Sequence, residues 1–278
     1  MAADPGVLSE RAPAKVNLYL HLCGQRADGY HLLDSLAVFP NVGDVLHAEV
    51  ADALSLQVTG PNAAGLSGET DNLVLRAATG LSDCGAALTL EKHLPVASGV
   101  GGGSSDAAAA LRLLSRLWDC AIPDDLPLAL GADVPVCMAA PTPMRMQGIG
   151  EVLTPAPHVP TCGIVLVNPG VEVPTGAVFK GVANRNPPAG PPWPDRFSNF
   201  DDFIGWLAMQ RNDLQAPAQA ICPAITGVLD VLSDAPLARM SGSGATCFAL
   251  YPTEAAAEAA ASELTQSHPD WWVAAAKF

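Results

Sequence analysis

Residues 98–118 read SGVGGGSSDAAAALRLLSRLW, a glycine-rich loop that leads into a long apolar segment. In that segment Leu111, Leu114 and Leu117 recur at the spacing of one helical face. Glycines let the backbone approach a ligand closely and adopt positive φ angles. The helix that follows offers unpaired amides and a partial positive charge, which favour an anion. The stretch predicts a phosphate-binding loop; a flexible loop with a Ser or Asp helix cap is the alternative.

The spacing of the glycines excludes the common nucleotide-binding loops. The loop is not a Walker A loop, because no Gly-Lys-Ser/Thr follows it. Counted from Gly99, the third glycine of a dinucleotide-binding fingerprint would fall on Ser104, and the protein-kinase loop fails for the same reason. A nucleotide would therefore be held by a loop of another type, and a dinucleotide oxidoreductase is excluded.

Composition limits the class of protein. The chain has 278 residues, enough for one large or two modest domains. Hydrophobic residues make up 49% and charged residues 15%, which argues against disorder. The formal net charge is −14, whereas nucleic acids and anionic membranes require a basic surface. We therefore expect neither as a partner, while backbone amides can still hold one small anion; the oligomeric state stays open.

The cysteines and the N-terminus predict the compartment. The seven cysteines are scattered and form no Cys-x-x-Cys pair, which is typical of free thiols in a reducing cytosol. The first fifteen residues lack the apolar core of a signal peptide. We expect a cytoplasmic protein without a metal site built from its own residues.

Periodicity along the chain predicts a mixture of strands and helices. From Ala14, AKVNLYLHL alternates polar and apolar residues, which predicts a half-buried strand with Lys15 and Asn17 on its polar face. A helix is expected at 71–81, with Asp71 or Asn72 as its cap. Further strands are expected at 45–50, 54–58, 87–95, 162–168, 245–251 and 271–276, and further helices at 201–209, 224–232 and 253–264.

Prolines mark the organisation of the chain. Pro155, Pro157 and Pro160 predict a junction between domains 1–158 and 159–278. Residues 187–194 are too rich in proline for the interior of a helix or strand, so we expect an exposed loop. Strands and helices do not alternate strictly, which favours an α+β fold with two domains.

Several polar residues could carry chemistry, and each has an ordinary alternative. Lys15 and Asn17 share one face of the first strand, where such residues are usually solvated. Asp133 is either a turn acid or a carboxylate held in a site. Tyr30 and His31 either cover the core or bind a base by stacking and hydrogen bonding. The glycines of Ser241–Thr246 form either a hairpin or part of a site.

Three stretches together resemble the GHMP family of small-molecule kinases. They are APAKVNLYL at 12–20, PVASGVGGGSSDAAAAL at 95–111 and SGSGATCFAL at 241–250, and they are spread over almost the whole chain. The resemblance implies a two-domain α+β GHMP-kinase-like fold with an interdomain active-site cleft. It also implies that ATP, accompanied by Mg²⁺, phosphorylates an alcohol in that cleft.

The resemblance also implies roles for individual residues. Lys15 and Asp133 match the catalytic positions, where the carboxylate would accept the alcohol's proton and the ammonium would offset phosphoryl charge. Nucleotide binding is implied for Asn72, Leu73, Lys92, Gly99, Gly101, Gly102, Gly103, Ser104 and Ser105. Substrate binding is implied for Asn17, Tyr30, His31, Thr175 and Phe179.

Within the family, ADGYH at 27–31 is similar to members whose acceptor is a cytidine-diphosphate-linked polyol. Such a substrate would place its cytosine against Tyr30, with Phe179 on the other face. The alternatives are a GHMP kinase of the homoserine or mevalonate type and a non-catalytic nucleotide sensor, which would lack the Lys–Asp pair. Ala37 stands where the family often has a pocket aromatic, and Pro127 predicts a curtailed helix before Asp133.

Overall fold

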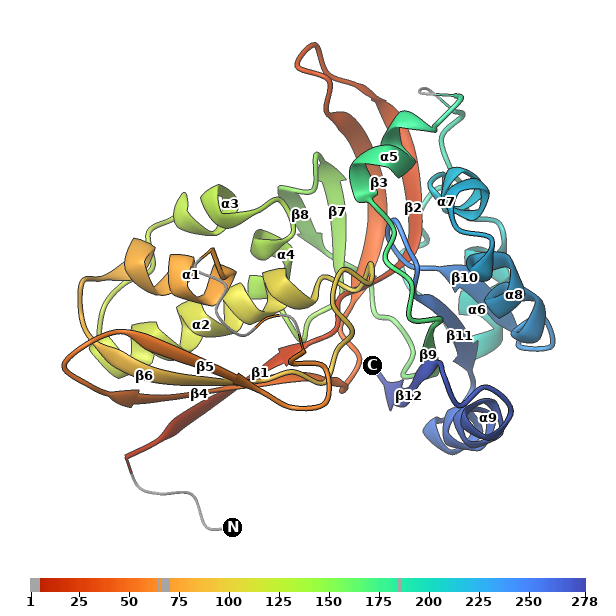
Figure 1. Ribbon diagram of the computed structural model, residues 1–278. Helices are drawn as coiled ribbons and strands as arrows, with labels where there is room; N and C mark the ends of the chain where they lie inside the picture. The colour runs from red at the N-terminus through yellow and green to blue at the C-terminus, as the bar shows by residue number, and fades with distance from the viewer. Residues whose placement is uncertain (1–5, 65, 67–70, 185–186) are drawn as a thin grey trace.

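The computed structural model describes residues 6–64, 66, 71–184 and 187–278. Within them the strands form three four-stranded sheets (Figure 1). The first sheet contains β1 (Leu8–Pro13), β4 (Gly43–Val50), β5 (Ser55–Thr59) and β6 (Ala86–Glu91). Its order is β1-β4-β6-β5, antiparallel except where β5 runs parallel to β6.

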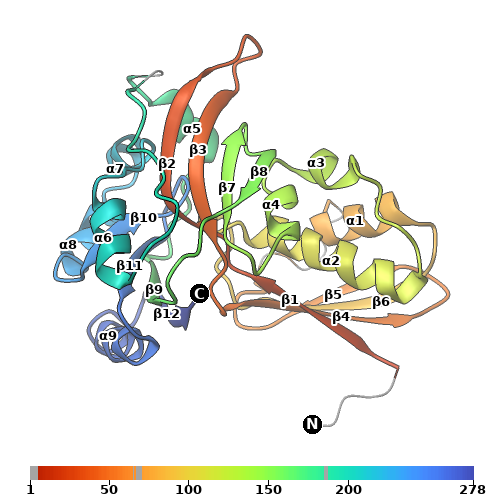
Figure 2. The same ribbon diagram turned by 180° about the vertical axis from the view of Figure 1, so that it is seen from behind.

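The other two sheets are antiparallel throughout. The second, in the order β2-β3-β7-β8, contains β2 (Val16–Gln25), β3 (His31–Val38), β7 (Met144–Gly148) and β8 (Val152–Pro155). The third, in the order β10-β11-β9-β12, contains β9 (Gly163–Asn168), β10 (Leu237–Met240), β11 (Cys247–Tyr251) and β12 (Trp272–Lys277). The long β2–β3 hairpin stands between the other two sheets in both views (Figures 1 and 2).

Helices cover the two outer sheets. The N-terminal helices are α1 (Leu73–Leu81), α2 (Gly102–Trp118), α3 (Leu126–Leu130) and α4 (Val134–Met138), and α1 and α2 pack on the first sheet. The C-terminal helices are α5 (Thr175–Lys180), α6 (Phe200–Ala208), α7 (Gln215–Ile221), α8 (Ala224–Val231) and α9 (Glu254–Ser267). The expected α+β class is confirmed, and so is each helix expected from periodicity.

The expectation of a half-buried first strand is wrong. Lys15, Asn17 and His21, on the side expected to face solvent, are no more than 4% exposed. Leu18 and Leu20 on the strand pack with residues of the C-terminal sheet and its helices. Both sides of β2 are therefore buried, because the sheet to which it belongs is sandwiched between the other two sheets.

The domain boundary after residue 158 lies between β8 and β9, where the chain leaves the second sheet for the third. We call residues up to 158 the N-terminal half and the rest the C-terminal half. One core spans both halves: Leu18 and Val38 belong to the same buried cluster as Leu166 and Phe248. The halves are therefore joined by shared packing, and the boundary itself stays a prediction.

The proline-rich segment 187–194 is anchored rather than free. The indole Nε1 of Trp193 donates a hydrogen bond to the Tyr19 hydroxyl at 3.0 Å. The carbonyl of Pro192 accepts a hydrogen bond from the Trp206 indole at 3.0 Å. The segment is therefore held against β2 and α6, and none of residues 187–194 lines the cleft described below.

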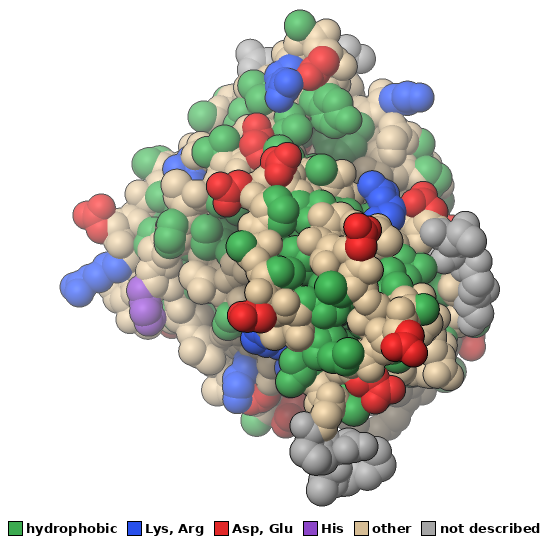
Figure 3. Space-filling view, turned by 90° about the vertical axis from the view of Figure 1, so that its left-hand side faces the viewer, with side chains coloured by type: hydrophobic (Ala, Val, Ile, Leu, Met, Phe, Trp, Pro, Cys, Tyr) green, Lys and Arg blue, Asp and Glu red, His purple; other side chains and the backbone are tan. Residues whose placement is uncertain are grey.

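The surface carries dispersed charge. Figure 3 shows the end of the molecule formed by the outer part of the N-terminal half, where acidic side chains lie scattered among basic and apolar ones. No helix in the described part of the chain combines the length and apolar character that a membrane crossing requires.

Candidate active site

A cleft of about 980 Å³ lies between the two halves. Its walls are residues 95–104, here called the phosphate loop, the β2–β3 hairpin, the starts of α1, α4 and α5, and Gly242–Ser243. Every site residue predicted from the sequence lines this cleft, with the exception of Ser105. Sequence reasoning therefore located the cleft, while the role of each lining residue stays a prediction.

Ser105 does not face the cleft, and its assignment to nucleotide binding is wrong. Its buried hydroxyl donates a hydrogen bond to the carbonyl of Pro13 at 2.7 Å. Its amide donates the first intrahelical hydrogen bond of α2, to the carbonyl of Gly101 at 2.8 Å. Both polar hydrogens of Ser105 are therefore used within the fold, because the helix turns this position toward β1.

The phosphate loop ends in a helix start without a side-chain cap. Gly101 is the N-cap of α2, with φ 63°, and no side chain bonds the first amides. The capping alternative is therefore wrong, and the amides of Gly102, Gly103 and Ser104 precede the first intrahelical bond. A Cβ on Gly101 would lie 3.1 Å from Cε of Lys15, so glycine also allows the lysine to pass. Unpaired amides beside an ammonium suit a bound phosphate.

The late glycine motif packs directly against the phosphate loop. Ser241–Thr246 connects β10 to β11 and is therefore a hairpin, but it also lies on the cleft. The Thr246 amide donates to the Ser98 carbonyl at 3.0 Å, and the Ser241 hydroxyl donates to the Gly99 carbonyl at 3.1 Å. A Cβ on Gly99 would lie 2.5 Å from the Gly244 carbonyl oxygen. Only glycine therefore permits this approach of the two loops.

Lys15 and Asp133 meet in the cleft although 118 positions separate them. The Lys15 ammonium donates to Oδ2 of Asp133 at 2.9 Å and to Oδ1 of Asn17 at 3.0 Å. Asn17 is itself fixed, because its Nδ2 donates to the Ser35 hydroxyl at 2.8 Å. The Lys15 side chain is 5% exposed and that of Asp133 is 39% exposed. The Lys15 ammonium is thus fixed by a buried partner, Asn17, while the Asp133 carboxylate remains accessible to a ligand.

The start of α1 forms another wall of the cleft. Asn72 is the helix cap, as expected, and its Oδ1 accepts a hydrogen bond from the Val74 amide at 2.9 Å. Leu73 packs over the phosphate loop, since its Cδ1 lies 3.6 Å from the position of a Cβ on Gly103. An apolar side chain and a helix terminus therefore flank the loop.

Aromatic residues gather at the hairpin end of the cleft. The rings of His31 and Phe179 are stacked, with centroids 5.3 Å apart and planes inclined by 29°. Tyr30, the residue just before β3, is 60% exposed. Thr175, at the start of α5, shares a hydrogen bond of 2.8 Å with the Ser243 hydroxyl. The predicted residues for a base lie together here, with His31 rather than Tyr30 against Phe179.

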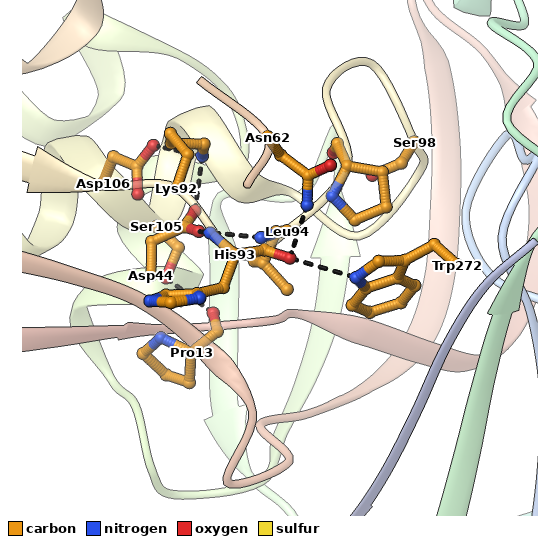
Figure 4. Close-up of polar contacts among 11 residues, drawn as sticks. Pro13, Asp44, Asn62, Lys92, His93, Leu94, Ser98, Ser105, Asp106 and Trp272 are labelled. Carbon is orange, nitrogen blue, oxygen red and sulfur yellow. Dashed lines mark hydrogen bonds and ion pairs between the residues drawn. The ribbon is translucent and has the colours of Figure 1, made fainter. Parts of the chain in front are cut away.

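Lys92 is held by two acids that the sequence did not single out. Its ammonium forms ion pairs with Asp44 and, at 2.8 Å, with Asp106 (Figure 4). Burial alone would lower the pKa of Lys92, but Asp106 and Asp44 raise it above its ordinary value. Burial raises the pKa of Asp106, and Asp44 acts in the same direction. Asp44, on β4, gave no signal in the sequence; Asp106 was visible only as the end of the glycine motif.

Ala37, Pro127 and Cys137 add no reactive group to the site. Ala37 is fully buried in the N-terminal core and does not line the cleft, so it does not shape the pocket directly. The helix before Asp133 is curtailed as expected, since α3 spans Leu126–Leu130 with Pro127 in its first turn. Burial, aided by Asp133, raises the pKa of the Cys137 thiol to about 12. Cys137 is therefore a neutral packing residue and not a nucleophile.

Comparison with known proteins adds independent findings. The sequence matches the family model for the GHMP kinases N terminal domain over residues 72–141 and that for GHMP kinases C terminal over residues 196–270. Curated proteins named 4-diphosphocytidyl-2-C-methyl-D-erythritol kinase resemble the chain over nearly its full length. One, from Cereibacter sphaeroides (strain ATCC 17029 / ATH 2.4.9), is 56% identical over 274 residues, which are 96% of this chain and 97% of that protein. Another, from Dinoroseobacter shibae, is 54% identical over 266 residues, 95% of this chain and 92% of that protein.

Solved structures agree with the sequence relatives. A crystal structure of 4-(cytidine 5'-diphospho)-2C-methyl-D-erythritol kinase superposes with a TM-score of 0.76 at 30% identity, covering 96% of this chain and 98% of that one. A mevalonate kinase structure superposes with a TM-score of 0.65 at 12% identity, covering 97% and 99%, and shows the shared fold alone. The chain therefore belongs to the GHMP kinase family of ATP-dependent enzymes, within its 4-diphosphocytidyl-2-C-methyl-D-erythritol kinase group.

Proposed function

We propose that this kinase transfers the terminal phosphoryl group of ATP to the 2-hydroxyl of 4-diphosphocytidyl-2-C-methyl-D-erythritol, a step of non-mevalonate isoprenoid precursor synthesis. The observation that carries the proposal is the meeting of Lys15 and Asp133 between an amide-lined loop and an aromatic cluster. Relatives at 50–56% identity bear the name of that activity. The loop would receive the triphosphate and the aromatic cluster the cytidine, so the reacting groups would meet at Asp133.

Asp133 is the proposed general base. A tertiary alcohol is a poor nucleophile, so a carboxylate within hydrogen-bond reach would accept its proton as the oxygen attacks phosphorus. Lys15, 2.9 Å from that carboxylate, would offset the charge on the phosphoryl group in transfer. Most of the rate gain would come from positioning and electrostatics, as in other phosphoryl transfers.

The phosphate loop is the proposed triphosphate site. The amides of Gly102, Gly103 and Ser104 would bind phosphate oxygens at the start of α2, with Gly99 and Gly101 allowing close approach. Asn72 and Leu73 would contact the nucleoside. Lys92 lies on the same wall, although its ammonium is engaged by carboxylates.

Mg²⁺ is proposed to accompany ATP. Within the described residues, no group of three or more His, Cys, Asp or Glu side chains could hold a metal ion. Of the loop's hydroxyls that line the cleft, Ser104 stands beside the proposed phosphate site. These residues fit an ion carried mainly by phosphate oxygens, because Mg²⁺ commonly binds through substrate phosphates and few protein ligands. When bound, the ion would neutralise phosphate charge.

The acceptor is proposed to bind at the hairpin end. Tyr30 would stack on the cytosine, Phe179 would cover its other face and His31 would bond its polar edge. Thr175 and Asn17 would complete the contacts with the rest of the acceptor. A homoserine- or mevalonate-type kinase needs no aromatic pair for a base, which is why we favour the cytidine-linked acceptor.

The reaction can be tested directly. Purified enzyme is given Mg²⁺ and ATP together with the cytidylyl-erythritol compound, homoserine or mevalonate, and ADP release is followed. We expect turnover only with the cytidylyl compound. Turnover with homoserine or mevalonate alone would overturn the proposed acceptor, and nucleotide binding without turnover on any acceptor would favour a sensor.

The free thiols bear on the compartment. Each of the seven cysteines is unpaired with another cysteine, and Cys23 and Cys84 are exposed. Exposed free thiols are typical of reducing compartments. On this basis we propose that the enzyme works in the cytoplasm on small-molecule substrates.

A further inference from the structure

Three buried charged residues connect the two ends of the phosphate loop. Lys92 precedes the loop, Asp106 follows it on α2, and Asp44 lies on the neighbouring strand β4 (Figure 4). All three side chains are no more than 5% exposed. The Lys92 ammonium contacts a carboxylate oxygen of each acid. One ammonium thus ties the strand that enters the loop to the helix that leaves it.

Asp44 fixes the backbone at the loop's entry as well. Its Oδ1 accepts hydrogen bonds from the amides of His93 at 2.6 Å and Leu94 at 2.8 Å, while its Oδ2 accepts from Lys92. A carboxylate that receives two amides and an ammonium holds the chain direction just before the loop begins. Figure 4 shows these contacts converging on Asp44 from the segment that carries Lys92, His93 and Leu94.

The contacts leave Lys92 poorly placed to act on a nucleotide by itself. Its Nζ lies 3.5 Å from the position of a Cβ on Gly102, directly under the first turn of α2. To reach a ligand in the cleft, the ammonium would have to leave Asp44 and Asp106 buried without a counter-charge. Leaving buried charges unpaired is strongly unfavourable.

We propose that Asp44, Lys92 and Asp106 form a positioning unit that holds the two ends of the phosphate loop, so that Lys92 acts on ATP through the loop and not as a direct ligand. The unit sets the separation between residue 94, where the loop's entry is fixed, and the helix amides that would receive the phosphates. The inference rests on the proposed role of that loop, but not on the identity of the acceptor.

Asp106→Asn distinguishes this role from the alternatives. The substitution preserves size but removes the charge that Lys92 binds on α2. If the unit positions the loop, Kd for a non-hydrolysable ATP analogue with Mg²⁺ should rise about 10- to 100-fold, as loss of a charged hydrogen bond predicts. If Lys92 were a direct ligand, Asp106→Asn would free the ammonium and leave affinity equal or tighter. If the residue were merely structural, the melting temperature would fall and Kd would not change.

The measurement is calorimetric titration of the folded protein without acceptor, and the matched control is Glu10→Gln. Glu10 bridges Arg112 and Arg116 of the same helix, each at 2.7 Å, but lies outside the cleft. The control should lose stability without losing nucleotide affinity. A wild-type protein that bound no adenine nucleotide would refute the proposed function itself, a result distinct from equal binding by Asp106→Asn, which would refute the positioning role.

A fully neutral variant covers the case in which single variants fold poorly. Combining Asp44→Asn, Lys92→Met and Asp106→Asn removes every charge of the unit, which avoids an unpaired buried ion. We expect this protein to fold, to bind the ATP analogue about 10- to 100-fold more weakly, and to bind the acceptor normally. Wild-type affinity for the analogue would overturn the proposal.

Discussion

The two ends of the cleft are built differently. At the phosphate end, hydrogen bonds fix the loop on several sides. The backbone amide of Lys15 donates to the Val100 carbonyl at 2.8 Å, and Ser241 and Thr246 of the C-terminal half also donate to loop carbonyls. At the hairpin end, the turn between β2 and β3 is closed by local contacts, such as the Arg26 amide on the Tyr30 carbonyl at 2.7 Å. The Arg26–Asp28 ion pair there is almost half exposed.

The two ends of the cleft therefore differ in how much conformational entropy they lose when a ligand binds. A loop already fixed by buried contacts loses little entropy when a phosphate binds, which is the advantage of preorganisation. An exposed Tyr30 must lose side-chain freedom when it stacks on a base. We infer that the phosphate end is set for chemistry by folding, whereas the hairpin end completes its shape on the acceptor.

The largest expected effect lies where the two ends meet. Asp133→Asn keeps the size of the side chain but removes the proposed general base, so we expect kcat to fall by about two to four orders of magnitude. The kcat of Lys15→Ala should fall by a similar amount. Steady-state kinetics measure the loss, and circular dichroism checks the fold. A folded Asp133→Asn enzyme with near-normal kcat would contradict the role of this carboxylate.

Two glycine substitutions compare the ends directly. Gly101 and Gly29 both have positive φ, at 63° and 91°, so alanine strains either backbone by about 1–2 kcal/mol. A Cβ at Gly101 meets Lys15 at 3.1 Å, whereas one at Gly29 has no atom of the described structure within 4 Å. We expect Gly101→Ala to lower kcat/KM for ATP by about 10- to 100-fold, as 1.4–2.8 kcal/mol would. Gly29→Ala, the control, should leave it unchanged; equal losses would show that the two ends do not differ.

The phosphate end could be predicted well because its signal is local. Glycines, hydroxyls and an apolar helical repeat stand side by side in residues 98–118, and α2 forms there. Ser105 was misassigned because the motif does not show which side of the helix a hydroxyl faces. Asp44 was missed because an acid on a strand is unremarkable until the fold sets Lys92 beside it.

The features that could not be predicted from the sequence depend on packing between residues far apart in the chain. The alternation of residues 14–22 correctly gave a strand but not its burial, since the C-terminal sheet that covers it comes from residues beyond 160. The short strand β10 and α7, which contains Pro217, carried no periodic signal and were not expected. No spacing rule brings Lys15 to Asp133; the family resemblance alone suggested that they meet.

A smaller effect is expected at the hairpin end. Tyr30→Ala should raise KM for the acceptor by about tenfold, because stacking of a base on an aromatic ring contributes about 1–3 kcal/mol. KM for ATP should stay unchanged, since the phosphate loop does not depend on this ring. Tyr30→Phe keeps the ring and serves as the control. Equal increases in both KM values would show that the two ends are coupled and not separately built.

The last expected effect is on stability and leaves activity at pH 7 unchanged. His21 on β2 is buried, and its Nε2 accepts a hydrogen bond from the Arg211 amide at 3.2 Å. Burial, followed by the charge of Arg211, lowers the pKa of His21 to about 4. In the unfolded chain His21 takes up a proton near pH 6.5, whereas in the folded chain it does so only near pH 4. The free energy of unfolding therefore falls as the pH drops through this window.

Between pH 7 and pH 4.5 this linkage should cost about 2 kcal/mol of the free energy of unfolding. His21→Gln has no such proton to bind, so its stability should decline less over the same interval. Urea denaturation of both proteins at the two pH values measures the difference, and the carboxylates common to both cancel. Because His21 does not line the cleft, kcat at pH 7 should be the same in the two proteins. Parallel stability curves would show that His21 is not held neutral, and a fall in kcat would show that the strand behind the hairpin also sets the chemistry.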